Sequence, residues 1–350
     1  MLSACIIVKN NEATLDNCLN SIKGLVDELI VVDTGSSDKT KEIAEKFGAK
    51  IYDFEWKDNF SEAKNYAISK ASNPWILEID ADEVISKLDH LKIKELLQEN
   101  KHLGYFLIQR NYTNEFGAFG WTSCVDDIYE ESKVASGFVP RKMLRLFKND
   151  PRIRNEGAVH NSVIKSVGKL GTTGDTEIPI HHFGSLNQTL ERVRWYVDIE
   201  KKNLKNDFFQ EYQIAIQLHR LGELDEALKH LIRSLELNKE FYLTLLEIAI
   251  ISIKKGKISE VRPLLLRSLQ LKDYGMTWSQ LGIVEAYEKN FEEAVKCFEK
   301  AVLSNDKNAD FHFNLGLSLF QSGNKERAKK ELDKAAYLNP YYKDKISFSS

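Results

Sequence analysis

The sequence predicts an α/β domain with a mixed sheet, followed by an all-α solenoid of repeated helix pairs. Two observations support this fold class. The first ~180 residues alternate short β-rich segments with amphipathic helical segments, which is the order of a sheet with crossover helices. From Phe208 onward the β-rich segments stop and a repeated helical pattern begins. We therefore place the two domains at residues 1–205 and 206–345.

The β-rich segments of the first domain differ in their place in the expected sheet. Residues 4–8, 28–32 and 75–79 are apolar enough to be buried strands. Helical segments with one apolar face separate the early strands and predict a parallel arrangement there. Later β-rich segments, one of them within a basic run with a predicted solvated face, make the sheet mixed. The remaining segments are strands at 50–54, 104–111 and 141–147, and helices at 11–22, 39–47, 60–71 and 88–99.

The second domain repeats itself every 34 residues. Gly222 and Gly256 are 34 residues apart, as are Ala294 and Ala328. This period is typical of tetratricopeptide repeats, which stack helix pairs into a concave surface that binds an extended peptide or a partner protein. A passive cap or a dimerisation surface would give the same pattern. Four units fit the sequence, at residues 207–240, 241–275, 276–309 and 310–343.

Composition and charge exclude several classes of protein. The net charge of −3 argues against a general binder of nucleic acid or anionic membranes. No apolar run reaches the ~20 residues of a membrane span, and the first residues lack the basic region of a signal peptide. The four cysteines show no C-x-x-C spacing, as expected of reduced thiols. We therefore expect a cytoplasmic protein without a transmembrane segment and without a nucleic-acid partner.

An acidic cluster follows the predicted strand at residues 75–79. It contains Asp80, Asp82 and Glu83. In an extended backbone, residues i and i+2 point to the same side, so Asp80 and Asp82 can face one point. That point would lie at the carboxyl end of a strand, where open α/β sheets bind ligands. Two carboxylates there suit Mg²⁺ or Mn²⁺ with open positions for phosphate oxygens. The alternative is a solvated turn that caps the next helix.

Three motifs at the ends of the predicted strands resemble family 2 glycosyltransferases of the GT-A fold. They are I-I-V-K-N-N-E, V-V-D-T-G-S-S-D-K-T and I-D-A-D-E. Residues 53–67, G-A-V-H-N at 157–161 and I-H-H-F-G at 180–184 resemble markers of a sub-group of that family. The resemblance runs in order through the first domain and includes bacterial members with trailing tetratricopeptide repeats. It implies a GT-A domain in front of the repeats.

The resemblance assigns the nucleotide site by position. Asp33 would hydrogen-bond the base, a uracil, while Glu12 and the backbone near Val8 would line the nucleoside pocket. Lys64 stands where the family usually has arginine in F-S-E-A-R-N. Lysine keeps the positive charge but loses the planar fork for phosphate oxygens. Asp80 belongs to the nucleotide site as well as to the metal site.

The resemblance also assigns the metal site and leaves the catalytic base open. Asp80 and Asp82 would hold Mn²⁺ or Mg²⁺, and His160 matches a histidine that closes over the diphosphate or the metal. Asn161 stands where relatives often have a glutamate that could serve as base. We favour Asp126 or Asp127 as the base, because the irregular stretch 112–137 could form the acceptor loop. The other candidates are Glu130, Glu131 and Glu156.

The sequence therefore predicts a metal-dependent, inverting glycosyltransferase that moves a sugar from a nucleotide-sugar donor, a UDP-sugar, to a peptide or protein held by the repeats. Inversion is implied by the family alone. One alternative is a transferase acting on a surface polysaccharide or a lipid-linked glycan. The other is a tetratricopeptide scaffold with a catalytically degenerate transferase domain. The intact Asp33, Asp80 and Asp82 argue against that scaffold, whereas Asn161 argues for it.

Overall fold

The computed structural model describes residues 1–114, 120–187 and 189–346, and the chain divides into two compact units. The first unit comprises Met1–Tyr112, Tyr129–Val134 and Pro140–Gln188. The second comprises Thr113–Ile128, Ala135–Val139 and Thr189–Ser350. The helical C-terminal half thus shares its unit with two short segments from the middle of the chain.

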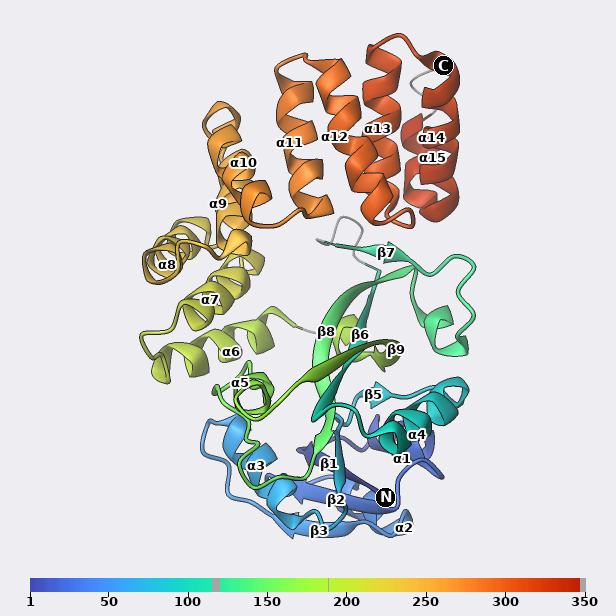
Figure 1. Cartoon of the computed structure of the whole chain (residues 1–350), viewed down its shortest axis with the longest axis vertical. Helices are drawn as coiled ribbons and strands as arrows, with labels where there is room; N and C mark the ends of the chain where they lie inside the picture. The colour runs from blue at the N-terminus through green and yellow to red at the C-terminus, as the bar shows by residue number, and fades with distance from the viewer. Residues whose placement is uncertain (115–119, 188, 347–350) are drawn as a thin grey trace. The chain divides into compact units, whose positions relative to one another are not determined.

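A mixed sheet forms the centre of the first unit, as predicted (Figure 1). Its strands run in the order β3-β2-β1-β4-β8-β6-β9-β5, and β7 pairs with the start of β8 in the second unit. The pairs β3–β2, β2–β1 and β1–β4 are parallel, and β4–β8 is antiparallel. The strands are β1 (Leu2–Val8), β2 (Glu28–Asp33), β3 (Lys50–Asp53), β4 (Trp75–Glu78), β5 (Glu83–Val84), β6 (Gly104–Thr113), β7 (Thr122–Ser123), β8 (Gly137–Lys148) and β9 (Thr173–His182).

Helices cover both faces of the parallel part of this sheet. Along β1, Ala4 and Ile6 belong to one apolar cluster and Cys5 to another, because successive side chains point to opposite faces. The first cluster includes α1 (Leu15–Ile22), α2 (Thr40–Lys46) and α4 (His90–Glu99); the second includes α3 (Phe60–Lys70) and α5 (Ile164–Gly168). Short 3₁₀ turns are η1 (Lys87–Asp89), η2 (Glu130–Val134) and η3 (Gly184–Asn187).

The helical part of the second unit begins with α6 (Leu190–Lys202) and continues with pairs of helices drawn from yellow to red in Figure 1. Small residues allow close packing within the pairs. A Cβ atom on Gly282 would lie 2.8 Å from the Phe298 ring, and one on Gly316 would lie 2.7 Å from Leu332. The helices are α7 (Phe208–Arg220), α8 (Leu224–Leu237), α9 (Tyr242–Lys254), α10 (Arg262–Leu271), α11 (Gly275–Tyr287), α12 (Phe291–Ser304), α13 (Ala309–Gln321), α14 (Lys325–Leu338) and α15 (Lys343–Ile346), with η4 (Ile258–Glu260) and η5 (Pro340–Tyr342). Within the described ranges, no helix combines the length and apolar character needed to cross a membrane.

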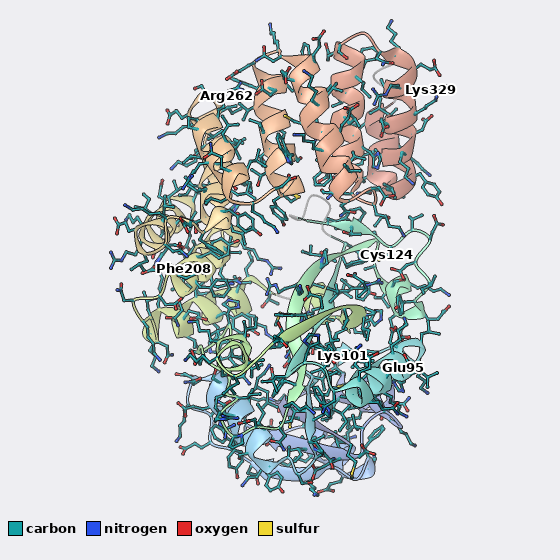
Figure 2. The ribbon with its side chains drawn as sticks, in the orientation of Figure 1. Glu95, Lys101, Cys124, Phe208, Arg262 and Lys329 are labelled. Carbon is teal, nitrogen blue, oxygen red and sulfur yellow. The ribbon has the colours of Figure 1, made fainter. Side chains whose placement is uncertain are left out.

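A short segment around β7 packs against the last repeat. Trp121 is 1% exposed and belongs to an apolar cluster formed with residues of α13, α14 and η5. The Asn308 side chain donates a hydrogen bond to the Trp121 carbonyl at 2.7 Å, and Ser123 Oγ donates to the Leu338 carbonyl at 2.7 Å. Cys124, labelled in Figure 2, follows this strand. The helical unit is therefore completed by residues that lie far ahead of its first helix, α6, in the sequence.

Glu28 ties the first strands together, and its replacement by Gln should destabilise the protein in a pH-dependent way. Its carboxylate accepts hydrogen bonds from Ser3, Lys50 and Ser72. Burial raises the pKa of Glu28, but these partners lower it more, to about 2. Because the folded pKa lies below the ordinary value of 4.5, the stabilisation is present above pH 4.5 and is lost as the pH falls toward 2.

We expect Glu28→Gln to cost about 1.5–3 kcal/mol of unfolding free energy at neutral pH, the range for hydrogen bonds to a charged group. Urea unfolding at neutral and acid pH measures the effect, with the exposed Glu42→Gln as control. The difference between Glu28→Gln and the wild type should shrink toward acid. A difference that stays constant with pH would contradict this role of the carboxylate.

Candidate active site

The predicted site residues of the first unit gather where the chain order of the strands reverses. From β1 the chain goes to β2 on one side and later to β4 on the other, so the switch point lies between β1 and β4. Val8 ends β1 and pairs with Asp33, the last residue of β2. Asp80 and Asp82 follow β4. Ligands of open α/β sheets bind outside the carboxyl ends of the strands at such a point.

Asp33 is a buried carboxylate with one oxygen unused. Its Oδ2 atom accepts hydrogen bonds from the backbone N–H groups of Gly35 at 3.1 Å and Ser36 at 3.0 Å, and Lys41 Nζ lies 3.6 Å away. Its Oδ1 atom is buried and has no hydrogen-bond partner among the described residues. Burial raises the pKa of Asp33, but Ser36, Gly35 and Lys41 lower it more, so it is ionised at neutral pH. Oδ1 is thus an acceptor that no donor among the described residues meets.

Val8 and Glu12 support the loops beside Asp33. The Val8 carbonyl accepts hydrogen bonds from the backbone N–H and the hydroxyl of Thr34, at 2.9 and 3.0 Å. Glu12 Oε2 accepts from the Lys39 N–H at 3.1 Å, and the Glu12 N–H donates to Asp38 at 3.1 Å. These contacts join the loop that follows β1 to the loop that follows β2. The Glu12 side chain itself is exposed.

Asp80 is held by two buried cations. Lys64 Nζ lies 2.9 Å from Asp80 Oδ1, and Arg145 Nη2 lies 2.6 Å from Asp80 Oδ2. The side chains of Lys64 and Arg145 are only 7% and 3% exposed. Burial raises the pKa of Asp80, but the two cations lower it further than that, well below its ordinary value. Lys64 therefore neutralises acidic side chains of the protein in this conformation.

Asp82 forms a small polar cradle with His182 and Gly184. His182 Nε2 lies 3.4 Å from Asp82 Oδ2, and His182 Nδ1 lies 2.7 Å from Asn111 Oδ1. The contact of Nδ1 with Asn111 thus orients the ring so that Nε2 faces Asp82. A Cβ atom on Gly184 would lie 2.2 Å from Asp82 Oδ2 and 2.8 Å from His182 Nε2. The space between the two side chains thus depends on the absence of a side chain at position 184.

His160 lies in the loop between β8 and α5, in the first unit. Burial and the nearby Arg141 lower the pKa of His160 to about 3, so its imidazole is neutral at physiological pH. Among the described residues, no three histidine, cysteine, aspartate or glutamate side chains lie together as a ready metal cage. The histidine found beside Asp82 is His182.

Asp126 and Asp127 belong to the second unit. The Tyr337 hydroxyl lies 3.1 and 3.0 Å from the two carboxylate oxygens of Asp126, and the Asp127 N–H donates to the Cys124 carbonyl at 3.1 Å. Part of the expected acceptor loop, residues 115–119, lies outside the described residues. The role of base at Asp126 or Asp127 stays a prediction.

The sequence pattern predicts no role for His182, Gly184 or Arg145, although each stands in a motif or a charged run. His182 and Gly184 belong to I-H-H-F-G, which served only as a family marker. Arg145 lies in the basic run at 141–148, for which we expected a solvated face. That expectation is wrong for Arg145, which is 3% exposed because three carboxylates surround its guanidinium group.

Two family models match the chain. The model described as "Glycosyl transferase family 2" matches residues 3–161, and the model described as "Tetratricopeptide repeat" matches residues 280–343. The first match covers the strands and loops that carry Asp33, Asp80 and Asp82. The second covers the last helix pairs.

Several curated proteins are similar in sequence. An uncharacterized glycosyltransferase of Rickettsia bellii is 46% identical over 58% of this chain and 67% of its own length. A TPR repeat-containing protein of Synechococcus elongatus is 36% identical over 47% of this chain, and glycosyltransferase SunS of Bacillus subtilis is 26% identical over 67% of it. The alignments span 36% of the Synechococcus protein and 53% of SunS.

Proposed function

Because the chain belongs to glycosyl transferase family 2, we propose that it moves a sugar from a UDP-sugar to a peptide or protein acceptor, with a divalent metal ion and with inversion at the anomeric carbon. The observation that carries this proposal is the set of carboxylates at the switch point of the sheet. Asp33 ends β2, and Asp80 and Asp82 follow β4 on the other side of β1. Neighbouring strands are about 4.8 Å apart, so these positions span roughly 10 Å along the sheet edge.

Asp33 supports the assignment of the base. Uracil offers an N–H group between two carbonyl oxygens, and the unused Oδ1 atom of Asp33 can accept that N–H. Lys41, whose Nζ atom is 3.6 Å from Asp33 Oδ2, is a donor beside the same carboxylate. An ionised aspartate offers no donor to a base nitrogen that carries a lone pair, as in cytosine. The Asp33 carboxylate, with Lys41 beside it, therefore favours uracil over cytosine.

The cradle around Asp82 fits Mn²⁺ or Mg²⁺. Asp82 and His182 would hold the ion with a carboxylate oxygen and an imidazole nitrogen, and the role of Asp80 and His160 as further ligands stays a prediction. Such ions commonly bind through one or two protein side chains and take their other ligands from substrate phosphates and water. When bound, the metal neutralises the charge that develops on the leaving diphosphate. His182 keeps its orientation through Asn111, as metal-binding histidines usually do through a second partner.

The repeats support a peptide or protein as the acceptor. Stacked helix pairs of the tetratricopeptide kind bind extended peptides on their concave surface. An acceptor hydroxyl or thiol needs a base to remove its proton as it attacks the anomeric carbon from the face opposite the diphosphate. Asp126 or Asp127 fills that role in the proposal, and the proton passes to its carboxylate.

Thermal unfolding with a panel of nucleoside diphosphates, with and without Mn²⁺, tests the proposed donor and metal. A ligand that binds only the folded protein adds about 2.7 kcal/mol of stability at a hundredfold excess over its Kd. We expect a shift with UDP that requires Mn²⁺, and a smaller one with the other diphosphates. No shift with any nucleotide, together with no hydrolysis of a UDP-sugar, would instead favour the scaffold with a degenerate transferase domain.

Gly184→Ala should impair the metal cradle while leaving the fold intact. The new methyl group would meet the end of the Asp82 side chain, which can rotate away at little cost to folding. Asp82 and His182 would then no longer face the same point. We therefore expect about a 10- to 100-fold loss of UDP affinity in the presence of Mn²⁺, the range for mutations of residues that support metal ligands. Titration calorimetry measures it.

Gly168→Ala is the matched control, since a Cβ atom there has nothing within 4 Å. Equal UDP affinities of the two glycine variants would count against a metal between Asp82 and His182.

A further inference from the structure

Arg145 is at the centre of a buried charge cluster beside the proposed donor site. It comes from β8, which pairs with the neighbouring strand β4, with Leu146 opposite Leu77. Its Nη1 atom lies 3.0 Å from Glu78 Oε1, and its Nη2 atom lies 2.6 Å from Asp80 Oδ2 and 3.0 Å from Glu83 Oε1. One guanidinium group therefore joins three carboxylates that follow one another along the chain.

The rest of the cluster leaves no carboxylate oxygen of these three acids without a donor. Lys64 Nζ lies 2.9 Å from both Glu78 Oε1 and Asp80 Oδ1. Asn155 donates to Glu78 Oε2 at 2.6 Å, the Asp80 N–H donates to Glu83 Oε2 at 2.8 Å, and Gln109 donates to Glu83 Oε1. Donors from α3, β6 and β8 thus meet the acids at the end of β4. Within this network, Arg145 Nε and Asn155 Oδ1 are buried without a partner among the described residues, but every carboxylate oxygen has a donor. The donors therefore restrict the three acids to one arrangement.

Asp80 is the member of this cluster that still reaches solvent. Its side chain is 32% exposed, whereas those of Glu78 and Glu83 are 7% and 0% exposed. Lys64 holds one of its oxygens and Arg145 the other, so rotation of the carboxylate would break an ion pair. Each oxygen has two lone pairs, and the second one stays available to a ligand on the exposed side.

We propose that Arg145 is a positioning residue of the sugar transfer, which holds the exposed edge of Asp80 toward the bound nucleotide. The proposal rests on the proposed function, because it gives Asp80 a donor to face. The planar fork of arginine can bind Asp80 and Glu83 through one nitrogen and Glu78 through another. A lysine has a single nitrogen on a flexible chain and does not reproduce that geometry. Charge alone is therefore insufficient at position 145.

The test compares Arg145→Lys and Arg145→Gln with Lys142→Gln. Lys142 lies on the same strand but is 47% exposed and pairs with Asp175 on the surface, so it is the matched control. UDP affinity in Mn²⁺ is measured by titration calorimetry, and kcat and KM by hydrolysis of UDP-glucose, all well below the unfolding temperature of each variant. These readouts are taken per folded protein, so a purely structural role would leave them unchanged.

We expect Arg145→Lys to fold and to bind UDP about tenfold more weakly. Its kcat should fall by a larger factor than its KM rises, because a misdirected Asp80 carboxylate misaligns the reacting groups. Arg145→Gln should lose more, or fail to fold because it leaves the three acids with Lys64 alone. Lys142→Gln should match the wild type. Wild-type UDP affinity and kinetic constants in folded Arg145→Lys would overturn the proposal. If the wild type itself shows no Mn²⁺-dependent binding of UDP, the proposed function fails instead.

Discussion

Asp82→Asn should lower the turnover of a UDP-sugar by at least about 10³-fold while the protein stays folded. A metal ion on the leaving diphosphate stabilises the transition state by several kcal/mol, and its loss raises the barrier by that amount. Each 1.36 kcal/mol of barrier is a factor of ten in rate. The fold should tolerate the change, because Asp82 is 21% exposed and the amide oxygen can still lie beside His182. Neutral amides are poor ligands for Mn²⁺ compared with carboxylates.

Hydrolysis of a UDP-sugar with saturating Mn²⁺ measures this loss, and thermal unfolding reports the fold. Asp175→Asn is the matched control, since Asp175 is 69% exposed and pairs only with Lys142 among the ion pairs of the described residues. The metal-dependent stabilisation by UDP should disappear in Asp82→Asn and persist in Asp175→Asn. Wild-type turnover in Asp82→Asn would exclude a metal at this carboxylate.

Trp121→Ala should cost the second unit about 3–5 kcal/mol of unfolding free energy, the range for removing a large buried aromatic side chain. Trp121 is 1% exposed and fills a space between the segment around β7 and the last repeat. Its cluster contains Ala309, Ala335, Leu338 and Tyr342. The substitution leaves a cavity that these packed side chains cannot close. Urea unfolding followed by helical circular dichroism measures the effect.

Trp121→Phe separates the ring from its N–H group. The indole nitrogen is buried and has no hydrogen-bond partner among the described residues, so its loss removes an unsatisfied donor. We expect Trp121→Phe to cost less than about 1.5 kcal/mol, as for swaps that keep most of the volume. A cost below 1 kcal/mol for Trp121→Ala would mean that the β7 segment is not a firm part of the helical unit.

The sequence predicts best where local pattern and tertiary structure agree. β1, β2 and β4 are apolar runs because helices cover both of their faces. The 34-residue period is visible in the fold in the last two helix pairs, where Gly282 and Gly316 allow the same close packing. The ends of the strands then place Asp33, Asp80 and Asp82 without further information.

The features that the sequence did not predict depend on pairing between strands that are distant in the chain. β9 contains Pro179, which argues against an interior strand, yet it pairs with β6 across a shift in register between Phe106 and Ile108. The antiparallel pairing of β9 with β5, in which His182 lies opposite Glu83, carries His182 to Asp82. Arg145 is buried because three acids from another part of the chain surround it, and no local pattern shows this. The surroundings of His182 and Arg145 are set by strand pairing, so the sequence alone does not predict them.

The path of the chain between the two units constrains how such a protein can evolve. The chain crosses from one unit to the other five times before α6 continues into the repeats. A recombination that exchanged only the C-terminal half would bring in a new last repeat without the β7 segment that packs against it. Trp121 and Ser123 would then face foreign side chains. The binding surface of the repeats should therefore change through point substitutions more readily than through exchange of whole repeat arrays.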